Sequence, residues 1–193
     1  MIKVRISKPA KPRVLDFDIE TLAAGYADPA WVPDKITATA WSWVGEKGVY
    51  SEADPYGFFD RERRRQIIRP LLAAIELADI VQGHNIIRFD LRVLNAECMR
   101  LGFRPLGPLR VLDTIRLPKA KGYKKGQEDL AVSLGIKEKK KKMGWQEWDD
   151  AYEEGPPWIA VKSRNVSDVQ QHKRLTEELE KRGMLKPVVE WRP

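Results

Sequence analysis

Apolar and acidic positions alternate strictly in one short stretch near the start of the chain. Between Val14 and Thr21, leucine, phenylalanine and isoleucine occupy every second position, and the positions between them are acidic. Successive side chains of a β-strand point to opposite faces, so the pattern predicts a strand with one apolar and one acidic face. The acidic face would carry three carboxylates, those of Asp16, Asp18 and Glu20.

The rest of the chain alternates between strand and helix patterns. β-Branched and aromatic residues predict a second strand over 36–44, and a glycine-containing turn leads to a third at 49–50. Apolar residues at helical spacing predict helices over 59–77, 87–101, 129–134 and 166–182. Short buried strands are expected at 80–81 and 111–114. Pro70 should kink or split the first helix. This alternation favours an α/β sheet over a bundle or a sandwich.

Length and composition favour one domain with extensions. A chain of 193 residues with 42% hydrophobic residues can bury one good core but not two generous ones. We therefore expect a single domain over 1–193, in which residues 1–12 form a basic N-terminal arm or edge strand. Residues 119–158 are expected to form a basic insertion. Its three tryptophans are expected to serve packing rather than base stacking: Trp145, Trp148 and Trp158.

The net charge favours a polyanionic partner. The formal charge is +7, and much of it gathers in an arginine cluster within 61–69 and a lysine cluster within 137–142. Such clusters are commonly solvated faces or mobile loops, and the alternative is contact with nucleic acid.

No membrane contact is expected, because no apolar stretch approaches the roughly 20 residues that span a bilayer. The first residues also lack the apolar segment of a secretory signal. The single cysteine, Cys98, cannot form an intrachain disulfide and is expected to be a core thiol. These features predict a reducing, cytoplasmic setting.

The acidic strand predicts a metal site, because close carboxylates take up protons unless a cation compensates them. The alternative is a strand whose acidic face lies in water. Two helical acids strengthen the metal interpretation: Asp90 falls in the first turns of its helix, and Asp168 lies on the inward face of the last helix. Each alone fits a solvated acid or one favoured by the helix dipole. Four such carboxylates can bracket two divalent metals roughly 4 Å apart and so promote phosphodiester cleavage.

Three segments resemble the motifs of the DEDD 3'-5' exonucleases, which have a ribonuclease-H-like fold. That family includes DnaQ-like proofreading subunits and the editing domains of family-B polymerases. The segments are Phe17-Asp18-Ile19-Glu20-Thr21, Gly83-His84-Asn85-Ile86-Ile87-Arg88-Phe89-Asp90-Leu91 and Asn165-Val166-Ser167-Asp168-Val169. Asp113-Thr114 and the stretch 129–136 resemble connecting segments of the same family. The resemblance implies a mixed β-sheet flanked by helices.

The resemblance also implies a set of functional residues. The catalytic metal ligands would be Asp18, Glu20, Asp90 and Asp168, and the cofactors would be two Mg²⁺ or Mn²⁺ ions. Asn85 would help to position the substrate, although asparagine is equally at home as a helix N-cap. Asp16 has no counterpart in the motifs and would support the site or simply be tolerated.

One position departs from the family. Its members usually carry a tyrosine four residues, or a histidine five residues, before the last aspartate, where it acts on the attacking water. Here those positions hold Arg164 and Ser163. His172, one turn after Asp168, is the candidate substitute, and its alternative is a buried histidine satisfied by neighbours. The general base therefore stays open.

The leading functional hypothesis is a metal-dependent 3'-5' exonuclease acting on single-stranded DNA or RNA 3' ends, alone or with a polymerase. The first alternative is a nucleic-acid-binding module on the same fold with weak or no catalysis, which would bind with strong salt dependence and no turnover. The second is an endonuclease, which would also cut a circular strand.

Overall fold

A mixed β-sheet forms the centre of the molecule. The computed structural model describes residues 11–22, 35–54, 60–117, 126–152 and 158–193, so the predicted arm lies almost wholly outside the described residues. The described strands are β1 (Val14–Leu22), β2 (Lys35–Trp43), β3 (Tyr50–Ala53), β4 (Ile80–Gly83), β5 (Leu109–Asp113) and β6 (Val189–Trp191). They form one sheet in the order β3-β2-β1-β4-β5-β6. β1, β4 and β5 run parallel, and the other pairings are antiparallel.

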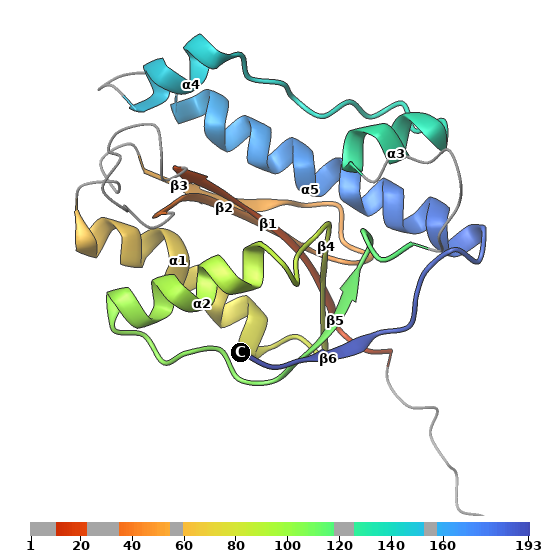
Figure 1. Ribbon diagram of the computed structural model, residues 1–193, viewed down its shortest axis with the longest axis horizontal. Helices are drawn as coiled ribbons and strands as arrows, with labels where there is room; N and C mark the ends of the chain where they lie inside the picture. Colours follow the sequence, from red (N-terminus) through yellow and green to blue (C-terminus); the bar gives the residue numbers. More distant parts are fainter. Residues whose placement is uncertain (1–10, 23–34, 55–59, 118–125, 153–157) are drawn as a thin grey trace, which may run out of the picture.

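Helices cover both faces of this sheet (Figure 1). The described helices are α1 (Arg61–Glu76), α2 (Asp90–Leu101), α3 (Gln127–Ser133), α4 (Trp145–Tyr152) and α5 (Trp158–Lys181). α1 and α2 lie on one face, and α5 lies on the other with α3 and α4 packed against it. The arrangement confirms the prediction of an α/β mixed sheet flanked by helices, compatible with a ribonuclease-H-like fold. None of these helices is long and apolar enough to cross a membrane.

The two faces of β1 separate apolar from acidic side chains as predicted. Leu15, Phe17 and Ile19 are buried in the main core, which they share with residues of α1 and α2. The intervening acids face α5, where Asp16 and Asp18 each contact a side chain of that helix. Burial of the apolar stripe fixes the register, since a one-residue slip would bury the acids in the apolar layer.

The second half of β1 lies beyond the end of β4. The two strands pair from Val14 to Asp16, and β4 ends at Gly83. A Cβ on Gly83 would lie 3.0 Å from the carbonyl oxygen of Phe17, so this position favours a residue without a side chain. Further along β1, the backbone N–H of Ile19 donates to the carboxylate of Asp90 instead of to a strand. The part of β1 that carries Asp18 and Glu20 therefore pairs with β2 on one side and extends past the end of β4 on the other.

Several elements differ from the sequence prediction. Pro70 was expected to kink or split the first helix, but it lies within α1, which continues as one helix from Arg61 to Glu76, so Pro70 does not split it. The buried residues around it hold the helix against the sheet despite the missing N–H. α5 begins at Trp158 rather than at residue 166, and α4 and the three-residue β6 were not predicted.

The tryptophans of the predicted insertion serve packing where their side chains are described. Trp158 is buried against Ala38 and Val161, and the partly buried Trp148 packs on the same cluster. The side chain of Trp145 lies outside the described part. Cys98 is buried and free, as expected. Trp148 and Trp158 thus help to attach α4 and α5 to the sheet.

Candidate metal centre

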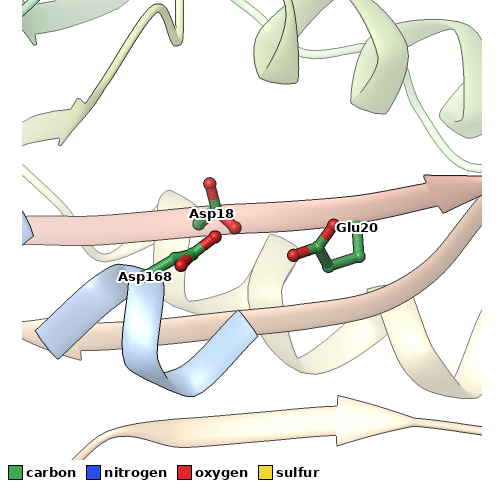
Figure 2. A group of neighbouring side chains, drawn as sticks. All are labelled: Asp18, Glu20 and Asp168. Atoms are coloured by element: carbon green, nitrogen blue, oxygen red, sulfur yellow. The ribbon is translucent and has the colours of Figure 1, made fainter. Parts of the chain in front are cut away.

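Three carboxylates meet between β1 and α5. Asp18 and Glu20 project from β1, Asp168 projects from α5, and one oxygen of each lies within 4.8 Å of the others. Figure 2 shows the three carboxylates directed toward one another from the two elements. We call Asp18, Glu20 and Asp168 the acidic group. Carboxylate oxygens at this spacing form a ligand set that suits Mg²⁺ or Mn²⁺.

Burial makes the acidic group costly to ionise without a cation. It raises the pKa of Asp18 well above the usual value, and the charges of Asp90, Glu20 and Asp168 raise it further. Burial also raises the pKa of Glu20 to about 7, although Arg164 opposes the shift. Both effects disfavour the charged form. A bound metal would reverse this balance by stabilising the ionised carboxylates.

One oxygen of the acidic group has no hydrogen-bond partner. Asp168 is 2% exposed, and its Oδ1 atom is buried without a donor. Buried acceptors are nearly always satisfied, so an orphaned carboxylate oxygen needs an explanation. A divalent cation among the three carboxylates would supply the missing partner, and the residues present therefore fit a metal.

Asp90 lies beside the acidic group but is not part of it. It is the first residue of α2, and its Oδ1 accepts a hydrogen bond from the backbone N–H of Ile19 at 3.2 Å. Burial raises the pKa of Asp90 to about 7, and the charges of Asp113 and Glu20 act in the same direction. The structure therefore brings three of the four predicted ligands within 4.8 Å of one another. The fourth, Asp90, lies outside that group but close enough for its charge to raise the pKa of Asp18.

Asn85 shapes the turn that leads from β4 to α2. Its φ of 63° lies in the left-handed region, which asparagine tolerates better than most residues. Its carbonyl accepts from the N–H groups of Arg88 and Phe89, and its own N–H donates to Asp113 at 2.8 Å. The N-cap of α2 is Phe89, so the alternative role of Asn85 as an N-cap is wrong.

His172 is buried and has hydrogen-bond partners on both ring nitrogens. Its Nδ1 lies 2.9 Å from the carboxylate of Asp16, and its Nε2 lies 2.9 Å from Thr114 Oγ1. Gln82 donates to the same carboxylate at 2.7 Å. This geometry matches the satisfied buried histidine that the sequence left as the alternative. It also shows that Asp16 is the hydrogen-bond partner of His172, a contact that the sequence did not predict.

Asn165 is a site residue that sequence reasoning missed. It is fully buried, and its Nδ2 donates to Asp18 Oδ2 at 2.7 Å. Its Oδ1 atom is buried without a partner. Asn165 precedes Asp168 by three positions on α5, so both side chains share one helix face. A polar residue at that spacing from the last acid is the signal that could have identified it.

Two basic side chains contact the acidic group. Arg164 donates from Nε to Glu20 at 2.9 Å, and its guanidinium lies over the ring of Trp148. Lys140 Nζ lies 2.5 Å from Asp168 Oδ2. Arg164 occupies the position where the resembled family carries a tyrosine, and no local pattern indicated that Lys140 would reach the site.

The arginine cluster of α1 lies on the other face of the sheet. Arg65 donates to the carbonyl of Leu101 and lies over the Phe103 ring, with its guanidinium carbon 4.5 Å from the ring centroid. Arg64 lies 3.9 Å from Glu97, whose side chain is fully buried. These two arginines therefore join α1 to α2 and its following loop, and the sheet separates them from the acidic group.

Comparison with known proteins identifies a structural neighbour. No family model matches the chain, and no curated protein is similar in sequence. A solved family B DNA polymerase from the hyperthermophilic archaeon Pyrobaculum calidifontis is similar with a TM-score of 0.64 and 18% identity over 90% of this chain. The match covers 25% of the polymerase, so this chain spans about a quarter of that protein. At this identity, the similarity establishes a shared fold.

Proposed function

We propose that the chain is a metal-dependent 3'-5' exonuclease that hydrolyses phosphodiester bonds at single-stranded 3' ends. The observation that carries the proposal is the meeting of Asp18, Glu20 and Asp168 within 4.8 Å. These residues come from the two segments that resemble the first and last motifs of the DEDD exonucleases. The orphaned, buried Oδ1 of Asp168 is an independent sign that the group accepts a cation.

The structural neighbour supports the proposal. The family that the motifs resemble includes the editing domains of family-B polymerases, and the neighbour is a family B DNA polymerase. The chain matches a quarter of that polymerase, which is the size expected of one domain within it. The direction of degradation, from the 3' end, is inferred from the motif resemblance.

The acidic group would hold the metal in this reaction. A bound divalent ion lowers the pKa of water and stabilises charge on the phosphoryl oxygens. Asn165 positions Asp18 by its 2.7 Å hydrogen bond, and Asp90 fixes the edge of β1 through Ile19. Because burial raises the pKa values of Asp18, Glu20 and Asp168, metal binding would release protons from the group.

A second candidate is a nucleic-acid-binding module without turnover. The contacts of Arg164 with Glu20 and of Lys140 with Asp168 favour it, because basic side chains compensate the acids without a metal. Such a module would bind oligonucleotides through phosphate contacts, and its affinity would fall steeply with salt.

The proposal is tested with single-stranded DNA and RNA labelled at the 5' end and incubated with Mg²⁺ or Mn²⁺. The expected result is a ladder of labelled products that shortens progressively from the 3' end, and no cleavage of a circular strand. Asp18→Asn is the matched control and should leave the strand intact. Cleavage of the circle would instead indicate an endonuclease. Salt-sensitive binding without shortening would support the binding module and contradict the exonuclease.

A further inference from the structure

The backbone of the lysine cluster is held against α3 and α5. Residues 137–142 have no regular secondary structure, but their backbone is held by side chains of two helices. Four hydrogen bonds, from 2.9 to 3.3 Å, attach residues 138–141 to side chains of α3 and α5, those of Glu128, Arg164, Ser167 and Gln171. A mobile loop therefore does not describe the backbone of this segment, whereas the exposed lysine side chains fit the predicted solvated face.

This attachment turns one lysine of the cluster toward the acidic group. Lys139, Lys141 and Lys142 are exposed, whereas Lys140 is partly buried. The side chain of Lys140 is 22% exposed, and its Nζ lies 2.5 Å from Asp168 Oδ2. Its charge also lowers the pKa values of Asp18, Glu20 and Asp168 against the effect of burial. One ammonium thus acts on all three carboxylates.

Arg164 supplies a second fixed cation. It lies 2.9 Å from Glu20 Oε1 and 3.9 Å from Asp168 Oδ2, and its Nη1 donates to the carbonyl of Lys141. When ionised, the acidic group carries three negative charges, and the neighbouring Asp90, whose charge acts on Asp18, carries a fourth. Lys140 and Arg164 cancel two of these charges. One divalent ion neutralises the remainder. A second ion bound through Oδ2 of Asp168 would have to displace the ammonium of Lys140.

We propose that Lys140 and Arg164 take the place of one divalent metal, so that the acidic group binds a single Mg²⁺ or Mn²⁺ ion. The inference rests on the proposed metal-dependent function and departs from the two ions that the motif resemblance implies. An ammonium offers three hydrogen-bond donors and a compact charge, so Lys140 can hold a phosphate oxygen where a second metal would otherwise do so.

The test is the number of Mn²⁺ ions bound by the full chain without nucleic acid, measured by calorimetric titration and by the paramagnetic signal of free Mn²⁺. Wild type is expected to bind one ion. Lys140→Gln, which keeps most of the length and removes the charge, is expected to bind a second ion or to bind the first at least tenfold more tightly. Lys142→Gln, an exposed member of the same cluster, should match wild type.

The outcomes separate this inference from the proposed function. Two ions bound to wild type would overturn the inference and leave the metal-dependent function standing. Binding that is unchanged in Lys140→Gln would equally overturn it. Wild type that binds no Mn²⁺ would contradict the proposed function, and the inference would fall with it.

Discussion

The imidazole Nδ1 of His172 lies 2.9 Å from the carboxylate of Asp16, which joins α5 to β1 next to the acidic group. The connection continues from His172 Nε2 to Thr114 Oγ1, and from there to Nδ1 of His84, each at 2.9 Å. Gln82 donates to Oδ2 of Asp16, which also lies 2.9 Å from His172 Nδ1. This chain, which passes through Thr114 directly after β5, links β1 and β4 to α5, so it fixes the two elements that carry the carboxylates.

Removing the imidazole should destabilise the fold. His172→Ala leaves the buried carboxylate of Asp16 without one of its donors, and we expect a loss of about 1–3 kcal/mol in the free energy of unfolding. Urea denaturation followed by circular dichroism measures it. Gln170→Ala, an exposed change on the same helix, is the control and should stay near wild type. In a double-mutant cycle, fully additive effects of His172→Ala and Asp16→Ala would contradict the interaction.

Asp18→Asn should abolish metal binding without lowering the stability of the metal-free protein. The substitution removes a negative charge that the like charges of Asp90, Glu20 and Asp168 repel. The metal-free protein should therefore melt at the wild-type temperature or above it. The rise in melting temperature that Mn²⁺ gives wild type should disappear. Differential scanning calorimetry measures both effects, and Glu76→Gln on the opposite face is the control. A variant that retains the full Mn²⁺ response would show that Asp18 is not a ligand.

Stability should depend on pH in opposite ways with and without metal. Burial raises the folded-state pKa values of Glu20 and Asp90 to about 7, from their ordinary values of 4.5 and 3.8. Between these values the native state holds protons that the unfolded state releases, so the metal-free protein loses stability as pH rises toward 7. Metal needs the ionised carboxylates, so its stabilising effect should grow over the same range. Melting temperatures measured at pH 5.5 and pH 8, with and without Mg²⁺, test this. A metal effect of equal size at both pH values would contradict it.

Gly83→Ala should disturb the end of β4. An added Cβ would lie 3.0 Å from the Phe17 carbonyl oxygen and from Ile86 Cδ1, and the backbone oxygen cannot move away cheaply. We expect a loss of about 1–3 kcal/mol in the free energy of unfolding, typical of overpacking. Gly107→Ala is the control, because nothing lies within 4 Å of its added Cβ. Equal stability of the two variants would contradict the close approach of β1 and β4.

The sequence alone was sufficient to predict those elements whose hydrophobic pattern is local. The period-two alternation in β1 identified both the strand and its two faces, because burial of Phe17 and its neighbours requires that register. The first and third motif segments contain Asp18, Glu20 and Asp168, which the fold brings together. The first turns of α5 escaped prediction because Trp158 is held by tertiary packing against β2 rather than by a strong local signal.

Side-chain pairings between distant segments were beyond local reasoning. Asp16 and His172 are 156 positions apart in the sequence but in contact in the structure, and no sequence pattern linked the two residues. Lys140 belongs to a run of like charges, which a sequence pattern treats as solvated. Backbone contacts with side chains of α3 and α5 turn this lysine inward. Asn165 was visible in the third motif, but its donor role became clear from its 2.7 Å contact with Asp18.

The most direct test of the central claim is the release of nucleoside monophosphates from a strand labelled at its 3'-terminal nucleotide. Wild type is compared with Asp168→Asn at increasing Mg²⁺ concentrations. We expect wild type to release the labelled mononucleotide first, in proportion to bound Mg²⁺, and Asp168→Asn to release about 10²-fold less or none, since it lacks a proposed metal ligand. Absence of release by wild type at any Mg²⁺ or Mn²⁺ concentration, or equal release by both proteins, would contradict the proposed exonuclease.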